Sequence, residues 1–297
     1  MALSTPQKWL VGCGIGCVGI IVIVVALISG AVVFVRGKIA PLQTASESRR
    51  KVAEALGETE SFAPPPDGAI SPEKMETFLA VREVLKADQS RIDAALANLD
   101  IESLNQGHPA FGSVLRFLND LSNLIAPFAE YVDHRNRILL DKRMALGEYG
   151  FIYSIAYHSW LHHPPEEGPM ILTQGNRRDR DRVFSDNPEL TPEGVRRQYR
   201  RLMARWLENQ LNGIRDAEQT KWRAALKNEM DRIDRDSGRV AWEDQLPPQI
   251  QNSLEPFRSR LTDTYHRSTN YFELLTMDEF RQFGSRGKTS DRDDESR

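Results

Sequence analysis

The sequence predicts an all-α protein, in which a single N-terminal transmembrane helix is followed by a soluble helical-bundle domain. Residues 9–35 contain no charged side chain, and a helix of that length reaches about 40 Å, more than the roughly 30 Å of hydrocarbon in a bilayer. Further along the chain, apolar residues recur at intervals of three and four, which is the period of an amphipathic helix. No hairpin turn flanked by alternating strands interrupts this pattern.

The apolar segment has the flanks of a membrane anchor. Trp9 stands at one end, with Arg36 and Lys38 at the other, where aromatic and basic residues meet the bilayer interfaces. Its β-branched centre would suit a buried strand in water, but in lipid the backbone must satisfy its own hydrogen bonds, which favours a helix. Lipidation of Cys13 or cleavage after Ala31 is the alternative. Because the apolar run follows Cys13 and exceeds the length of a signal-peptide core, we expect an uncleaved signal-anchor.

Two opposing rules bear on the orientation of the anchor. Basic residues after the anchor favour a cytoplasmic domain; they are Arg36, Lys38, Arg49, Arg50 and Lys51. A short tail followed by a long apolar run is instead typical of a bacterial signal-anchor, and long domains cross the membrane largely regardless of charge. We expect a single-pass membrane protein whose soluble domain is periplasmic or otherwise extracytoplasmic.

Small residues follow one face of the predicted transmembrane helix. Small side chains let two helix backbones approach closely, which is the basis of small-xxx-small association in membranes. Glycine is also common in transmembrane helices that do not pair. The face predicts a homodimer formed through the transmembrane helix, and it consists of Gly12, Gly16, Gly19, Ala26 and Gly30.

Helix-breaking residues and composition divide the chain into five parts. Consecutive prolines interrupt a helix, and a stretch with little apolar surface cannot fold. The parts are a short N-terminal tail (1–8), the transmembrane helix (9–35), a juxtamembrane helix with a proline-rich linker (36–70), the soluble helical domain (71–283) and a disordered tail (284–297).

Start signals and apolar periodicity define the helices of the soluble domain. Ser71 followed by Pro72 is an N-cap with an N1 proline and predicts a helix to about residue 98. A second helix is expected near Phe111, with a bend or end at Pro127. The remaining helices are predicted over about 133–161, from Thr191 to Ile233 with a weak point at Asn212-Gly213, and from Leu246 onward.

Charge and cysteine content exclude several classes of function. The formal net charge is −3, and basic residues alternate with acids, as between Arg177 and Arg182, so no nucleic-acid surface is predicted. Both cysteines, Cys13 and Cys17, lie in the apolar segment, so the domain can form no disulfide or zinc-thiolate site. The sequence also lacks a phosphate-binding glycine loop and a nucleophile elbow.

Three histidines near the end of the helix over 133–161 are candidate metal ligands. His158 and His162 are four residues apart and project from one helix face, His163 follows, and Glu166 in the next loop can add a carboxylate. The sequence is not a His-Glu-x-x-His protease motif, because serine follows His158. Histidines near a helix C-terminus also interact with its dipole without a metal, so both interpretations stay open.

Tyrosines spaced four apart form a second candidate site. Tyr149, Tyr153 and Tyr157 make a polar-tipped aromatic stripe, which can line a pocket for a lipid or other small apolar ligand with Glu148 at its mouth. Such a stripe more often belongs to the core, with its hydroxyls reaching the edge of the bundle. We favour the core interpretation, and no catalytic role follows from it.

A well-patterned fold without a catalytic constellation favours a non-enzymatic protein that needs no cofactor. We expect it to contact the lipid bilayer through residues 9–35 and to bind or organise a protein partner at the bacterial cell envelope. The alternative is a membrane-tethered metal-binding protein or metal-dependent enzyme that uses His158, His162 and His163.

Overall fold

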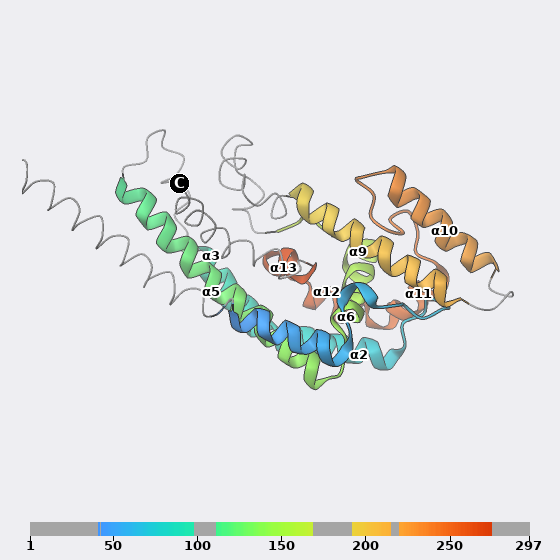
Figure 1. The fold of residues 1–297 in the computed structure, drawn as a ribbon, viewed down its shortest axis with the longest axis horizontal. Helices are drawn as coiled ribbons and strands as arrows, with labels where there is room; N and C mark the ends of the chain where they lie inside the picture. Colours follow the sequence, from blue (N-terminus) through green and yellow to red (C-terminus); the bar gives the residue numbers. More distant parts are fainter. Residues whose placement is uncertain (1–40, 42, 98–110, 169–191, 215–219, 275–297) are drawn as a thin grey trace, which may run out of the picture.

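Helices are the regular secondary structure of the residues that the structure describes (Figure 1). The structure is a computed structural model that describes residues 41, 43–97, 111–168, 192–214 and 220–274. Within these ranges no β-strand occurs, which confirms the all-α prediction for this part of the chain.

Several predictions fall outside the described residues. These are the transmembrane helix over 9–35 with its glycine face, and the C-terminal tail over 284–297. Among the helices that are described, none has the length and apolar character needed to cross a bilayer.

The helical elements of the described part of the chain are α-helices, short 3-10 turns and a π-helix. In chain order they are η1 (Thr59–Ser61), α2 (Pro72–Val84), α3 (Lys86–Ala97), α5 (Phe111–Asp141), α6 (Leu146–Tyr153), the π-helix η2 (Ser154–Trp160), α9 (Pro192–Gly213), α10 (Thr220–Arg235), α11 (Pro248–Leu254), η5 (Glu255–Phe257), α12 (Arg258–Thr264), η6 (Arg267–Thr269) and α13 (Asn270–Leu274).

A helix over residues 43–56 precedes these elements and belongs to the same core. It ends at Gly57, whose φ of +97° is readily adopted by glycine alone. Ala45 and Val52 are buried. The Asn136 side-chain amide, from α5, donates to the Ala45 carbonyl at 3.4 Å and to the Ser48 hydroxyl at 3.2 Å. A helix is therefore present over 43–56 and docked on α5, and its position beside a membrane stays a prediction.

The proline-rich segment after Gly57 interrupts this helix as predicted, but it packs into the domain where we expected a linker. Its turn η1 lies against α6 and α9. The Trp206 indole N–H donates to the Thr59 carbonyl at 2.8 Å, and the Gln210 amide donates to the Pro65 carbonyl at 2.6 Å. Because a non-helical segment has backbone carbonyls without helical partners, side chains of α9 can bind them. Residues 57–70 are part of the folded unit.

Gly147 marks a close approach between this segment and α6. A β-carbon added there would lie 2.5 Å from the Thr59 carbonyl oxygen and 2.5 Å from Phe62 Cβ. We expect Gly147→Ala to lower the free energy of unfolding by about 1–3 kcal/mol in urea denaturation, because the backbone of η1 must move. At Gly213 a β-carbon meets nothing within 4 Å, so Gly213→Ala should change stability by less than about 0.5 kcal/mol. Equal losses in the two variants would contradict the close packing.

The helix predicted from Ser71 to residue 98 is divided into α2 and α3. Ser71 caps α2 as expected, accepting a backbone N–H at 3.3 Å. The division falls at buried Leu85. It lets α3 follow α5 while α2 packs against α6 and α12. Apolar periodicity did not indicate the break, because both halves keep the same spacing.

Helix α5 continues through Pro127, where a bend or an end was expected. Proline leaves one carbonyl in the preceding turn without a donor. The residues that follow, including Phe128 and Val132, are buried in the core, and this packing offsets the lost hydrogen bond. The chain then turns at Arg143, where φ is +53°, so the predicted helix over 133–161 is wrong and two shorter elements, α6 and η2, stand at its end.

In the C-terminal half of the chain, the observed helices agree with the predicted ones more closely than in the N-terminal half. Helices α9 and α10 pack against each other (Figure 1), and α9 has its last residue at Gly213, within the predicted weak point. The single helix predicted after Leu246 is instead a series of short elements from α11 to α13. Pro256 lies in the 3-10 turn η5 between α11 and α12, where its missing N–H removes one helical hydrogen bond at the break.

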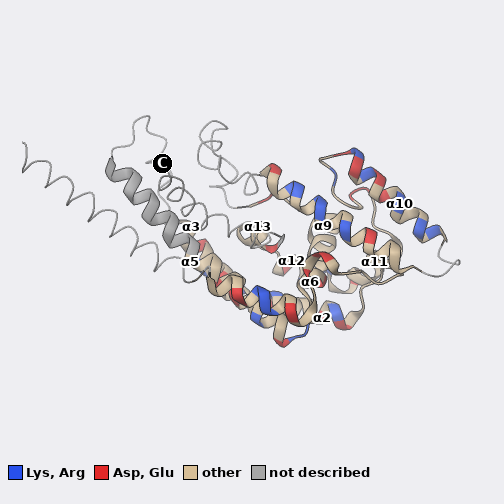
Figure 2. Ribbon diagram, in the orientation of Figure 1, with Lys and Arg blue, Asp and Glu red and all other residues tan. Residues whose placement is uncertain are grey.

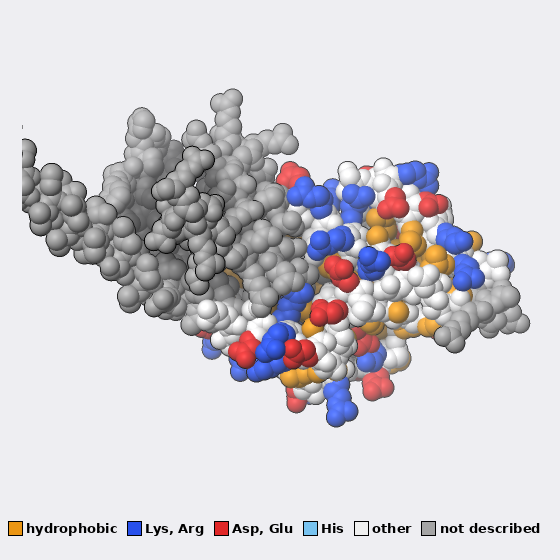
Figure 3. All heavy atoms as spheres, in the orientation of Figure 1, with side chains coloured by type: hydrophobic (Ala, Val, Ile, Leu, Met, Phe, Trp, Pro, Cys, Tyr) orange, Lys and Arg blue, Asp and Glu red, His pale blue; other side chains and the backbone are white. Residues whose placement is uncertain are grey.

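The described surface mixes charges of both signs. Lys and Arg alternate with Asp and Glu along α9 and α10 (Figure 2), and the face seen in Figure 3 shows the same mixture between small apolar areas. Large hydrophobic side chains that are strongly exposed among the described residues are Val84 and Leu140. Opposite charges this close together largely cancel at a distance.

Candidate functional site: a buried arginine socket

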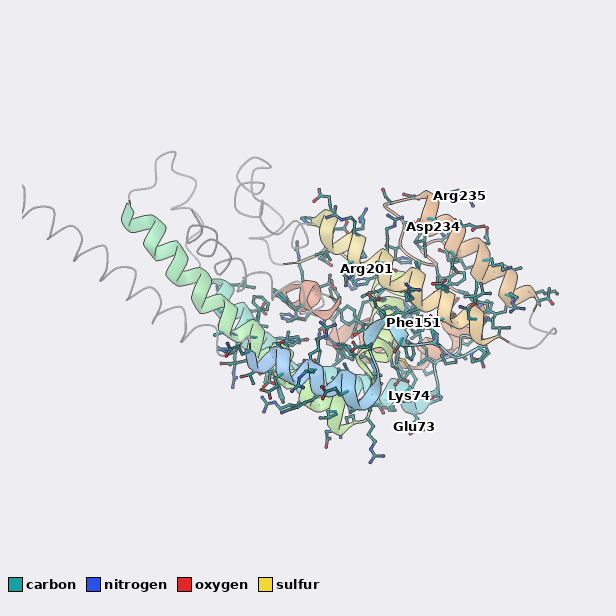
Figure 4. All side chains as sticks on the ribbon, viewed as in Figure 1. Glu73, Lys74, Phe151, Arg201, Asp234 and Arg235 are labelled. Carbon is teal, nitrogen blue, oxygen red and sulfur yellow. The ribbon has the colours of Figure 1, made fainter. Side chains whose placement is uncertain are left out.

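The tyrosine stripe lies in the core of the domain. Tyr149, Tyr153 and Tyr157 are fully buried. Phe151 of α6, which lies between the first two in the sequence and is labelled in Figure 4, is buried as well. Glu148 lies at the edge, where its carboxylate pairs with Lys74 at 2.9 Å. The rings therefore pack inside the bundle.

Each hydroxyl of the stripe meets a polar group from the C-terminal segment 264–273. The pairs join residues more than a hundred positions apart, and each distance is that of a normal hydrogen bond. They are Tyr149 with Glu273 (3.0 Å), Tyr153 with Asn270 (2.8 Å) and Tyr157 with Thr264 (2.9 Å). The hydroxyls of the stripe therefore bind side chains of the same chain, and the ligand pocket stays a prediction.

Glu273 of α13 is the centre of a buried charged cluster. Its carboxylate is ion-paired with Arg82 and with Arg135, the latter at 3.1 Å from Nη1 to Oε2. Tyr131 and Tyr149 donate their hydroxyls to the same carboxylate. All five side chains are at most 2% exposed. We call Arg82, Arg135, Tyr131 and Tyr149 the arginine socket.

The charge states within the socket follow from burial and proximity. Burial alone would raise the pKa of the Glu273 carboxyl, but the guanidiniums of Arg82 and Arg135 hold that pKa below its ordinary value. Burial raises the pKa of the Tyr131 and Tyr149 hydroxyls, which are therefore neutral donors. Burial opposes the charged form of Arg82, yet its tyrosine neighbours and Glu273 keep its pKa well above the ordinary value.

The socket holds two guanidiniums for one carboxylate. Nη2 of Arg82 donates to the Thr264 carbonyl at 2.8 Å, and its guanidinium carbon lies 5.2 Å from the ring centre of Tyr153. Arg135 Nη1 donates to the Phe272 carbonyl at 2.9 Å. The Nε atoms of both arginines have no hydrogen-bond partner among the described residues. The excess positive charge is thus shared among neutral dipoles and an aromatic face.

Sequence reasoning missed Arg82, Arg135 and Glu273. A pattern for the arginines was present, because Arg82 lies three residues after Leu79 and Arg135 three residues after Val132, both on apolar faces. Charged residues in such positions are seldom fully buried unless they are paired. The partner could not be assigned, since Glu273 is 191 residues from Arg82 and 138 from Arg135.

His158, the first candidate metal ligand, lies buried in η2. Its Nδ1 is 2.8 Å from the His163 carbonyl, and a carbonyl only accepts, so Nδ1 carries the proton and Nε2 carries the lone pair. That Nε2 has no partner among the described residues. The ring of His163 stacks on Tyr265, with ring centres 3.6 Å apart. The two histidines therefore contact each other through the backbone carbonyl of His163.

The other two candidate ligands lie in different surroundings. Glu166 is ion-paired with Arg196 of α9, and His162 follows η2 in a left-handed conformation with φ of +57°. Within the described ranges, no three or more His, Cys, Asp or Glu side chains are grouped so as to hold a metal ion. Metal binding stays a prediction, which elemental analysis of the purified protein and of His158→Ala would test.

Burial of His158 gives the fold a pH dependence. Burial lowers the pKa of His158 from 6.5 to about 4, so between these values the unfolded chain binds a proton that the folded chain does not. The free energy of unfolding should fall by up to about 3 kcal/mol as the pH drops from 6.5 to 4, with the full contribution present above pH 6.5. Urea denaturation across this range should show a shallower slope for His158→Gln. Equal slopes in the two proteins would contradict this assignment.

No protein-family model matches the sequence, and comparisons with curated proteins and with solved structures find no match. The function is therefore inferred from the geometry of this chain.

Proposed function

We propose that the protein is a single-pass, non-enzymatic membrane protein whose helical domain binds or organises a protein partner at the bacterial cell envelope, on the extracytoplasmic side. The observation that supports this proposal is the docking of helix 43–56. Its buried Ala45 and Val52, and the hydrogen bonds from Asn136 to Ala45 and Ser48, make it part of the domain. The domain therefore begins almost immediately after the apolar segment.

The short connection limits how far the domain can lie from the bilayer. Residues 36–42 separate the apolar segment from the docked helix. Seven residues span at most about 25 Å when fully extended, whereas a free linker to residue 70 would reach several times farther. A domain held at this distance meets partners that share the same membrane, and its mixed surface charge suits a protein partner better than a nucleic acid.

Fractionation tests the anchor, and a reporter tests the orientation. We expect the full-length protein in the membrane fraction, resistant to an alkaline wash, and we expect Val22→Arg to weaken insertion, since arginine at the centre of a membrane helix costs about 2.5–3.5 kcal/mol. A reporter that is active only outside the cytoplasm, fused after Arg297, should be active. A freely soluble full-length protein would contradict the proposal.

Photo-crosslinking in native membranes tests the partner. Crosslinkers placed at exposed Val84 and Leu140 should give a discrete protein adduct, while one placed at buried Leu202 should give none because it cannot reach a neighbour. The absence of any adduct from a set of exposed positions around the domain would contradict a partner-binding role.

The glycine face of the anchor predicts a homodimer in the membrane. Gly16→Leu should weaken dimerisation about tenfold, because a bulky side chain separates the two backbones. Ile28→Leu lies on the opposite side of a helix and is the matched control. Energy transfer between donor-labelled and acceptor-labelled copies of the protein in lipid vesicles reports the dimer fraction. Unchanged energy transfer in Gly16→Leu would remove the homodimer from the proposal.

A further inference from the structure

The arginine socket has the chemistry of a carboxylate-binding site. Arg82 and Tyr131 contact Oε1 of Glu273, while Arg135 and Tyr149 contact Oε2. Each carboxylate oxygen is therefore met by one guanidinium and one neutral hydroxyl. The four donors come from α2, α5 and α6, so they are fixed by the core and not by α13 itself. Charge-assisted bonds of this kind are the stronger hydrogen bonds in proteins.

The carboxylate is presented by a short segment, much as a bound peptide presents a side chain. Helix α13 has five residues and follows the 3-10 turn η6. Two neighbours of Glu273 frame it: the Asn270 amide donates to the Glu167 carbonyl at 2.6 Å, and the ring of Phe272 stacks on Phe128 with centres 3.9 Å apart. The acid is held between a hydrogen-bonded amide and a stacked ring.

A second buried glutamate provides a comparison within the same chain. Glu229 of α10 binds Arg239 at 3.0 Å, and Arg239 also binds Glu243 at 2.8 Å and Asp244 at 3.1 Å. Removal of Glu229 would leave Arg239 with two acids. Removal of Glu273 would leave both arginines of the socket without an acidic partner among the described residues.

Stability alone does not account for a cluster of this composition. Burying ions costs several kcal/mol each, and well-packed apolar residues of similar volume are often equally stabilising. The two arginines also exceed the charge of their single carboxylate, and both keep an unpartnered buried Nε. The donors are thus more numerous than one internal glutamate requires.

We propose that the arginine socket is a binding site for a carboxylate ligand, and that Glu273 occupies it as an internal ligand. A carboxylate presents lone pairs on two oxygens, which match two opposed guanidiniums and two neutral hydroxyls. When the Glu273 side chain is cut back, a small carboxylate ion from solution takes its place.

Chemical complementation of the full-length chain tests this site. Glu273→Ala is expected to lower the Tm, and acetate is expected to raise it again along a saturating curve that recovers roughly half of the loss or more, because a ligand that binds only the folded state stabilises it. Chloride at the same ionic strength should give no saturating rise. The unchanged protein should not respond to acetate, since Glu273 fills its socket.

Two further variants separate site binding from general effects of acetate. Glu273→Gln keeps the volume of the side chain and leaves no space, so its Tm should be lowered and independent of acetate. Glu229→Ala opens a comparable space in the other cluster, but Arg239 keeps Glu243 and Asp244, so no response to acetate is expected.

Each result of these titrations either supports the carboxylate site or overturns it. If Glu273→Ala is unfolded in the absence of acetate, its folded fraction by circular dichroism is followed over the same titration, and recovery specific to acetate supports the site. The proposal is overturned if acetate and chloride act alike on Glu273→Ala, if neither restores folding, or if Glu229→Ala and Glu273→Gln respond to acetate as strongly as Glu273→Ala.

Discussion

Glu273→Ala is expected to lower the free energy of unfolding by about 3–5 kcal/mol, because it leaves two buried guanidiniums without their counter-ion. Arg82 and Arg135 are each ion-paired with Glu273 in the interior of the bundle. They cannot reach solvent without opening the packing of α2 and α5. Urea denaturation followed by circular dichroism in the absence of added carboxylate measures the loss.

Glu255→Ala is the matched control for this experiment. Glu255 also pairs with an arginine, Arg258, at 3.0 Å, but both side chains are about half exposed. Water and salt screen such a pair, so its loss should cause no measurable change. A Glu273→Ala variant as stable as Glu255→Ala would mean that the buried arginines are solvated in solution.

The pH dependence of the socket has a defined sign. Because Arg82 and Arg135 hold the pKa of Glu273 below its ordinary 4.5, its stabilising contribution is fully present above that pH. The contribution is lost as the pH falls through the lower pKa of the folded state. Acid denaturation of the bundle therefore continues below the pH range in which His158 titrates in the unfolded chain.

Trp206→Ala is expected to cost about 3–5 kcal/mol, the range for removing a large aromatic side chain from a core. Trp206 is fully buried, packs edge-on against Phe151 with ring centres 6.1 Å apart, and donates its indole N–H to the Thr59 carbonyl at 2.8 Å. Equilibrium denaturation measures the total loss. Limited proteolysis measures the release of residues 57–70, which the indole holds against α9.

Trp206→Phe separates the two contributions of this residue. Phenylalanine keeps most of the packing but cannot donate to the Thr59 carbonyl, so it should cost clearly less than alanine while still increasing cleavage within residues 57–70. If both variants left this cleavage unchanged, residues 57–70 would not be held by α9 in solution.

Local rules predicted where helices begin more reliably than where they end. Ser71 caps α2 as expected, because a cap acts within one turn of the chain. The predicted bend or end at Pro127 is wrong, because the packing of the residues that follow it outweighs one lost hydrogen bond. The helical class was accessible from periodicity, whereas the breaks at Leu85 and Arg143 depend on neighbours far along the chain.

The sequence likewise predicted the local pattern of the candidate site but not its long-range contacts. The tyrosine stripe could be predicted, because positions four apart share a helix face. The role of the stripe could not be predicted, because the hydroxyl of Tyr149 binds a carboxylate 124 residues away in the sequence. The histidine motif illustrates the converse: His158 and His162 have the spacing of metal ligands, yet the π-helix ends between them and His162 adopts a left-handed backbone. Spacing along a helix is informative only while the helix continues.

The separation between Arg82 and Glu273 also bears on how the chain matures. These residues are 191 positions apart, and ribosomes add about 5–20 residues per second, so the nascent polypeptide waits on the order of 10 to 40 seconds between them. Throughout that interval Arg82 has no Glu273 with which to pair. Completion of the buried cluster is consequently a late event in biosynthesis, because it requires the synthesis of α13.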